Sequence, residues 1–220
     1  MLTGSWPSPA GGDEFALSFD QQRDKRVLVI PALFDESNKL RHFTVEVMRR
    51  LDTGGVDSML PDLPGTNESL APLTEQTVSG WRAAVEAAAS HFKATHVLTL
   101  RGGTLLDPGT LPGLRYASVG GTALLRGLVR VQLLSDKEAD LTTTRDELVA
   151  RAESQGAQLA GYDLGPAMVR ELAEAEAPDG PATEVKQAEM GGAGLWLRAE
   201  PAFDADQADA LAALMLEQVG

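Results

Sequence analysis

The chain has no cysteine, and only three of its 220 residues are histidines. Without cysteine, disulfide bonds, thiolate zinc sites and cysteine nucleophiles are all excluded. His42, His91 and His96 are scattered, and no two stand four residues apart as in a helical metal-binding pair. The sequence therefore predicts no metal site, and nothing in it points to a cofactor.

Basic residues are also few. The chain carries 19 Lys and Arg against 32 Asp and Glu, a net charge of −13. Such a chain repels polyanions, so we expect no nucleic-acid partner. No apolar run approaches the roughly 20 residues of a membrane span. Residues 1–12 have neither the basic flank nor the apolar segment of a secretory signal, so we expect a cytoplasmic protein.

The remaining composition is that of one globular domain. Hydrophobic residues make up 43% of the chain, and a chain of this length buries enough surface for a sizeable core. Residues 1–12 are rich in Gly and Pro, which predicts a flexible N-terminal arm before a single domain at 13–220.

Short apolar segments alternate with amphipathic ones along most of the chain. This alternation predicts an α/β fold with a mostly parallel sheet and helices on both faces. The expected strands are 15–19 at an edge, 26–33, 56–63, 95–100, 114–119 and 184–189. The expected helices are 38–51 capped by Ser37, one capped by Thr74 and running to about residue 92, and 205–219. Amphipathic helices between about residues 122 and 175 predict a helical insertion that could form a lid.

The segment 99–103 reads T-L-R-G-G, between an expected strand and an expected helix start. This is where an α/β-hydrolase places its nucleophile elbow, G-x-S-x-G. Arg101 stands at the serine position, and a guanidinium stays protonated and cannot attack a carbonyl. Ser118 lies in a second strand-to-helix turn, but no histidine follows it as a hydrolase triad requires. We therefore predict no catalytic triad.

Four segments resemble the exosortase A system-associated hydrolases, in particular the type 2 group. They are 31–41 (PALFDESNKLR), 60–69 (LPDLPGTNES), 100–103 (LRGG), and 161–167 (GYDLGPA) with 194–201 (GLWLRAEP). The resemblance implies a reduced α/β-hydrolase-like fold and a setting in exopolysaccharide production or surface sorting. Asp107, Pro108 and Pro112 shorten the helix that normally follows the elbow, so the scaffold looks trimmed.

These segments supply the candidate site residues, each with a structural alternative. Arg101 is expected to clamp an anionic ligand, to form an ion pair with Asp35 or Glu36, or to take a direct part in catalysis. Asp62 either orients a ligand or caps the following turn, and Trp196 either lines a cleft or packs internally. The charged cluster is either a binding crevice or an ordinary helix start. This cluster comprises Asp35, Glu36, Asn38, Lys39 and Arg41.

Three functional hypotheses follow. The first is a non-catalytic protein that binds a small anionic or carbohydrate-linked ligand, or a protein partner, at the strand ends. The alternative is a genuine hydrolase of an ester or acyl substrate in which Asp35 or Glu36 activates water. The third is an interaction protein that forms a homodimer through the helices of its second half.

Overall fold

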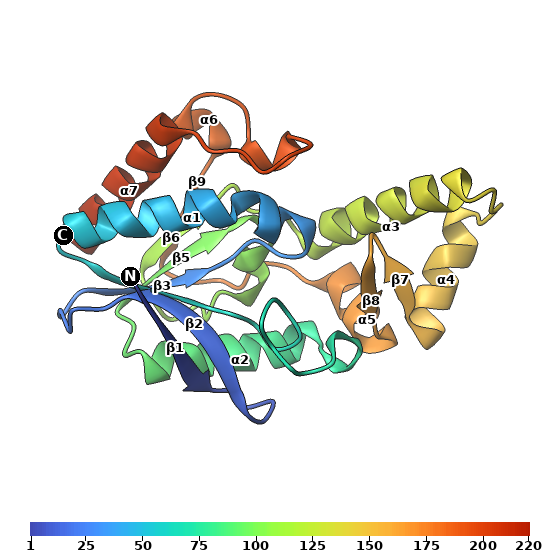
Figure 1. Cartoon of the computed structure of the whole chain (residues 1–220), viewed down its shortest axis with the longest axis horizontal. Coiled ribbons are helices and arrows are strands. Elements are labelled where there is room, and N and C mark those ends of the chain that lie inside the picture. Colours follow the sequence, from blue (N-terminus) through green and yellow to red (C-terminus); the bar gives the residue numbers. More distant parts are fainter.

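The computed structural model describes all 220 residues and is built around a seven-stranded sheet (Figure 1). The strand order is β1-β2-β4-β3-β5-β6-β9. Strands β4, β3, β5, β6 and β9 are parallel, while β1 and β2 form an antiparallel hairpin beside β4, so the predicted mostly parallel sheet is confirmed. The strands are β1 (Leu2–Pro7), β2 (Asp13–Phe19), β3 (Arg26–Ile30), β4 (Asp57–Pro61), β5 (His96–Leu100), β6 (Gly113–Tyr116) and β9 (Ala182–Val185).

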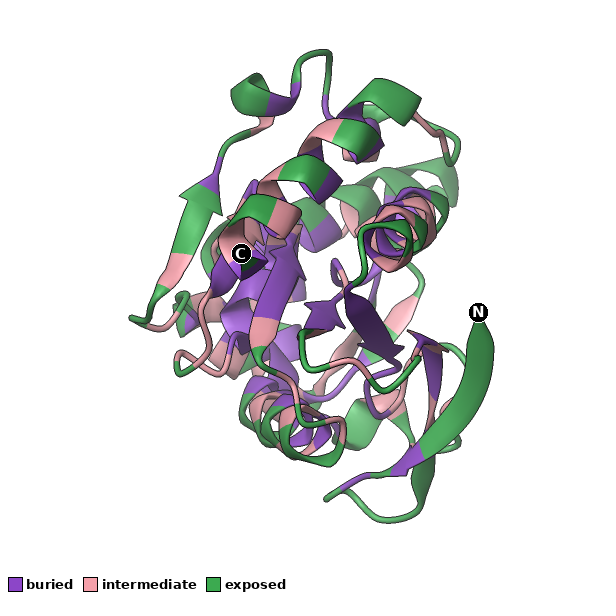
Figure 2. Cartoon of the chain, turned by 90° about the vertical axis from the view of Figure 1, so that its left-hand side faces the viewer, coloured by how far each residue is buried: buried purple, intermediate pink, exposed green.

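Helices cover both faces of this sheet, as the apolar strand sequences predict. Along β3, Val27 and Val29 face one hydrophobic cluster, and Leu28 and Ile30 face the other. Helices α1 (Asp35–Thr53) and α7 (Ala205–Val219) cover the first face, and α2 (Val78–His91) covers the second. The strands are therefore buried on both sides, and the helices expose only their outer faces (Figure 2).

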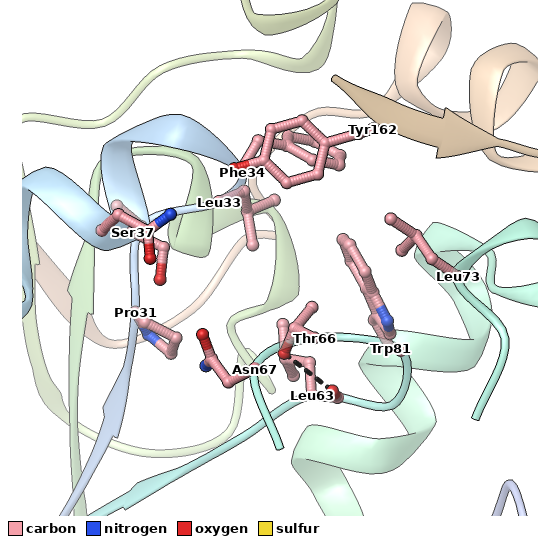
Figure 3. Close-up of a pocket in the computed structure, with 13 residues that line it drawn as sticks. Pro31, Leu33, Phe34, Ser37, Leu63, Thr66, Asn67, Leu73, Trp81 and Tyr162 are labelled. Carbon is pink, nitrogen blue, oxygen red and sulfur yellow. Dashed lines mark hydrogen bonds between the residues drawn. The ribbon is translucent and has the colours of Figure 1, made fainter. Parts of the chain in front are cut away.

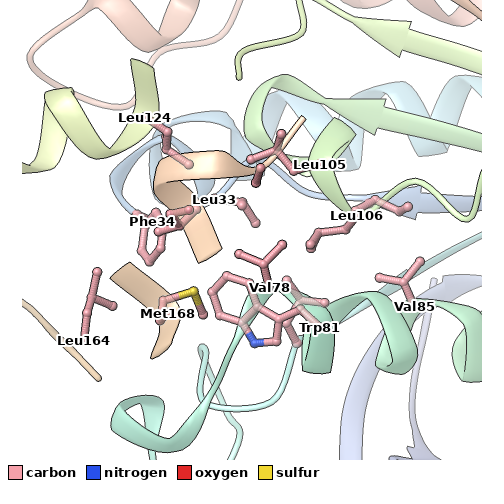
Figure 4. Close-up of a cluster of buried hydrophobic side chains, with 14 of the residues drawn as sticks. Leu33, Phe34, Val78, Trp81, Val85, Leu105, Leu106, Leu124, Leu164 and Met168 are labelled. Carbon is pink, nitrogen blue, oxygen red and sulfur yellow. The ribbon is translucent and has the colours of Figure 1, made fainter. Parts of the chain in front are cut away.

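The predicted insertion lies between β6 and β9. It consists of α3 (Gly121–Glu138), α4 (Arg145–Gln155), the hairpin β7 (Ala157–Leu159) and β8 (Tyr162–Leu164), and α5 (Pro166–Glu174). Figure 1 shows it beyond the end of the sheet where α1 begins, which is the carboxyl end of β3. Leu124, Leu164 and Met168 join the core around Phe34 and Trp81, so the insertion is packed onto the main domain (Figure 4).

The N-terminal residues differ from the prediction. Leu2–Pro7 form the edge strand β1, and the Trp6 side chain is 1% exposed. Hydrogen bonding to β2 and burial of the indole hold this segment against the sheet. The predicted edge strand at Phe15–Phe19 is consequently an inner strand, flanked by β1 and β4.

Some boundaries also move. Thr77, not Thr74, caps α2 by accepting a hydrogen bond from the Gly80 amide, while Thr74 lies in the 3₁₀ turn η1 (Leu73–Glu75). Helix α1 begins at Asp35, before the predicted Ser37 cap. The predicted last strand ends at Val185, and α6 (Gln187–Met190) follows it. Two further 3₁₀ turns are η2 (Arg101–Leu106) and η3 (Leu195–Leu197).

Candidate functional site

The elbow lies where the sequence places it, at the carboxyl end of β5. The backbone turns at Arg101, whose φ of 52° falls in the left-handed region that residues with a Cβ seldom adopt. Gly103 lets the turn approach β3, because a Cβ there would overlap the carbonyl oxygen of Pro31. The 3₁₀ turn η2 ends at Leu106, immediately before Asp107 and Pro108, so no full α-helix follows the elbow directly.

The Arg101 side chain is engaged on all sides. Its Nε and one terminal nitrogen donate to the two Glu36 oxygens, each at 3.0 Å, and the other terminal nitrogen donates to the Ala117 carbonyl at 2.7 Å. The guanidinium carbon lies 3.9 Å from the ring centre of Trp196, a cation–π contact. The predicted ion pair is thus formed with Glu36, while Asp35 pairs with Lys39.

Ser118 has an acid beside it but no imidazole. Its hydroxyl donates to a Glu184 oxygen at 2.6 Å, its backbone N–H binds the other Glu184 oxygen at 3.0 Å, and the Thr104 hydroxyl lies 3.1 Å away. A serine without a histidine lacks the base that removes its proton in a Ser-His-Asp triad.

The three histidines lie elsewhere. His42 stacks on Phe203 with ring centres 4.7 Å apart, and His91 packs against Phe92 at 4.8 Å. His96 is the first residue of β5 and lies 2.9 Å from the Thr95 hydroxyl, at the opposite end of the strand from the elbow. Burial lowers the pKa of His96.

A crevice of about 310 Å³ opens beside the elbow, between the start of α1 and helix α3. We call it the Lys39 crevice. Asp35, Glu36 and Lys39 line its polar side, and Trp196 also borders it. Lys39 binds Asp35 at 2.8 Å; the Lys39 side chain is 19% exposed and that of Asp35 60%. Apolar residues of α3 form the other wall: Leu124, Leu128 and Val131.

A second hollow of about 300 Å³ lies on the other side of Phe34 (Figure 3). We call it the Trp81 pocket. Asn38 lines it together with Ser37, Asn67 and Tyr162.

Asp62 is 1% exposed and does not line the Trp81 pocket, but it contacts Asn67, which does. It accepts a hydrogen bond from the Asn67 amide at 2.7 Å and lies 3.5 Å from Arg41. Burial raises the pKa of Asp62 despite these two partners. These contacts hold the turn that follows β4, which is the structural alternative for this residue.

The fold therefore separates the predicted site residues into groups. Four of them line the Lys39 crevice, Asn38 lines the Trp81 pocket, and Arg101 and Asp62 line neither hollow and serve as structural partners.

Sequence reasoning missed the α3 wall, because Leu124 and Leu128 repeat as ordinary core positions. It also missed Glu184, whose approach to Ser118 depends on the pairing of β6 with β9.

Nowhere does the fold gather three or more acidic or histidine side chains into a group that could hold a metal ion. None of the helices has both the length and the apolar character needed to span a bilayer.

No protein-family model matches the sequence, and no curated protein sequence matches it. Solved structures do match. DcsB in complex with its substrate analogue has a TM-score of 0.58 at 9% identity, with 99% of each chain covered.

Two others give similar values. Alpha/beta hydrolase domain-containing protein 10 from mouse has a TM-score of 0.54 at 15% identity, over 84% of this chain and 77% of that one. A candidate hydrolase from Agrobacterium vitis S4 has a TM-score of 0.52 at 14% identity, over 100% and 99%. The chain has the α/β-hydrolase fold.

Proposed function

We propose that this protein is a non-catalytic member of the α/β-hydrolase fold that binds a small amphiphilic ligand with an anionic head in the Lys39 crevice. The observation that carries the proposal is the engagement of Arg101. The residue at the nucleophile position makes two hydrogen bonds to Glu36, one to the Ala117 carbonyl and a ring contact with Trp196. Nothing at this elbow can attack a carbonyl carbon.

The same contacts argue against hydrolysis by activated water. Glu36 is bound to Arg101 through both of its oxygens, and Asp35 is paired with Lys39. Neither carboxylate is free to act as a general base without first losing a cationic partner.

The lining of the crevice supports the ligand class. Leu124, Leu128 and Val131 offer an apolar wall, and Val131 is half exposed, so apolar surface is available to a ligand tail. Lys39 is the one cation of the lining. Its partner Asp35 is mostly in solvent, and such exposed pairs contribute only about 0.2–1 kcal/mol. An anionic head can therefore replace Asp35 on Lys39 while an apolar tail lies along α3.

The sequence resemblance gives the proposal a setting. Resemblance to the exosortase A system-associated hydrolases predicts a role near exopolysaccharide production or surface sorting. A ligand from that setting is predicted to be anionic or linked to carbohydrate.

Binding of octanoate tests the proposal. Trp6 and Trp81 are each 1% exposed, so a change in tryptophan emission that disappears in Trp196→Phe reports on the crevice. We expect saturable octanoate binding, weaker binding of 1-octanol, and a loss of about five- to tenfold in octanoate affinity in Lys39→Met. Lys137→Met is the matched control, because Lys137 is exposed and forms no ion pair.

Absence of saturable binding, or equal octanoate affinity in Lys39→Met, would contradict the proposal. Turnover of p-nitrophenyl octanoate that is lost in Glu36→Gln would establish the hydrolase alternative in its place.

A further inference from the structure

We propose that the Trp81 pocket is a second ligand site, which takes a neutral ring bearing hydroxyl groups, such as a hexopyranose or a cyclitol. The pocket measures about 300 Å³, the lower end of the range for small-molecule sites, and so suits a single ring. No Asp, Glu, Lys, Arg or His lines it, although the chain as a whole carries a net charge of −13.

One side of the pocket is aromatic. The Phe34 ring meets Tyr162 edge-on with centres 5.3 Å apart, and it meets Trp81 at 5.8 Å with the planes tilted by 47°. The Trp81 indole N–H donates to the Pro64 carbonyl at 2.9 Å, which fixes its orientation. Figure 3 shows Trp81 and Leu73 facing the cavity from the same side. Trp81 itself is 1% exposed, so the accessible part of this side comes from the half-buried Tyr162 and Leu73, whose apolar surface suits the C–H face of a saturated ring.

The opposite side is polar and uncharged. Ser37 and Asn67 lie there together in Figure 3. The side chains of Ser37 and Asn38 and the hydroxyl of Tyr162 make no hydrogen bond within the chain. The amide nitrogen of Asn67 donates to Asp62, which leaves the amide oxygen of Asn67 free to accept. Burial and the negative charge of Asp35 raise the pKa of Tyr162, so this phenol stays protonated.

These free groups define what the pocket accepts. Hydroxyl and amide groups can both donate to and accept from a ligand hydroxyl. A charged ligand would enter a cavity with no opposite charge on its lining, and burying an unpaired charge is costly. The pocket therefore selects neutral polyhydroxylated rings over their acidic forms.

The backbone of the pocket is strained at two positions. Phe34 has a φ of 55° and Asn67 a φ of 47°, both in the left-handed region. Such conformations are unfavourable for residues that carry a Cβ, and they concentrate at functional sites. The turn that carries Asn67 is pinned by the Asp62 bond and by a Thr66 hydroxyl that donates to the Leu63 carbonyl at 2.8 Å. The structure thus holds Phe34 and Asn67 in place before any ligand arrives.

The site is independent of the Lys39 crevice, with which it shares only Leu33 and Phe34. No polar group of one hollow lines the other. If octanoate does not bind, only the proposed function is contradicted. If the neutral rings do not bind, only this inference is contradicted.

Saturation-transfer NMR on the intact protein tests the inference. The probes are methyl α-D-glucopyranoside, methyl β-D-galactopyranoside and myo-inositol, with D-glucuronate as the charged comparator. We expect transfer to the ring C–H protons of at least one neutral probe and little transfer to glucuronate. The double variant Ser37→Ala/Tyr162→Phe removes two hydroxyls with no partner in the chain, so it should fold normally and bind at least fivefold more weakly.

Two controls complete the experiment. Thr142→Ala removes an exposed hydroxyl that has no side-chain hydrogen bond and lies outside the pocket lining, and it should bind like the parent protein. Lys137→Met removes an exposed cation outside the pocket lining and should also bind the neutral probes normally. Transfer to none of the neutral probes, equal transfer to glucuronate, or unchanged affinity in the double variant would overturn the inference.

Discussion

Replacing Glu36 by Gln tests the claim that Arg101 is a structural residue at the elbow. The two side chains of this pair are 14% and 20% exposed, and two hydrogen bonds of 3.0 Å join them. A glutamine has nearly the same shape but no charge, so one guanidinium N–H group loses its acceptor and the cation loses its counter-charge. The Ala117 carbonyl and the Trp196 ring stay in place.

The expected cost follows from this partial burial. Removing one partner of a fully buried ion pair costs about 3–5 kcal/mol, and an exposed pair contributes at most about 1 kcal/mol. The pair lies between these limits, so we expect Glu36→Gln to lower the free energy of unfolding by about 1–3 kcal/mol. For a chain of this size, that corresponds to a fall in Tm of roughly 3–10 °C.

A double-mutant cycle isolates the interaction between the two side chains. Urea unfolding followed by circular dichroism would be measured for the parent, Glu36→Gln, Arg101→Met and the double variant. We expect the double variant to lose less than the sum of the single losses, with a coupling of about 1 kcal/mol or more. Additive losses, or a Glu36→Gln variant as stable as the parent, would show that the pair does not hold the elbow.

Three other predictions follow from the same structure. Arg101→Ser and Ser118→Ala are both expected to leave hydrolysis of p-nitrophenyl esters at the level of buffer, since neither elbow has a histidine; esterase activity gained by Arg101→Ser would contradict this. Gly103→Ala should destabilise the fold by about 1–3 kcal/mol in urea unfolding, because its Cβ would overlap the Pro31 carbonyl; a neutral effect would mean the elbow shifts freely. Burial raises the pKa of Glu14 above its ordinary 4.5, because the folded protein disfavours the charged carboxylate. At low pH the protonated Glu14 therefore favours the folded state. This contribution to the free energy of unfolding is lost as the pH rises through the raised pKa of the folded state. Glu14→Gln should therefore gain stability relative to the parent between pH 4 and pH 8 in thermal unfolding, and a constant difference across that range would refute the reasoning.

The hydrophobic pattern of the sequence predicted the sheet and its helices. The residues at which these elements begin and end depend also on contacts between distant segments. Strands β3, β4 and β5 and helices α1 and α7 follow from short apolar runs and from apolar residues repeating at three and four positions. The same pattern did not predict the N-terminal strand β1, because the Gly and Pro content of residues 1–12 is typical of a flexible arm. Pairing with β2 and burial of Trp6 hold it instead.

The number and positions of cysteine and histidine in the sequence were enough to exclude a catalytic triad at the elbow. With no cysteine, and with no histidine after His96, neither Arg101 nor Ser118 could belong to a triad in hydrolase order, whatever the fold. Which acid binds Arg101 was beyond the sequence, because Asp35 and Glu36 are neighbours whose side chains point about 100° apart around a helix. Only the packing of α1 against the sheet and η3 directs Glu36 to the guanidinium, whereas Asp35 meets Lys39 one turn further along the same helix. The two hollows beside Phe34 likewise depend on where the insertion folds back over the sheet, a contact between segments far apart in the chain.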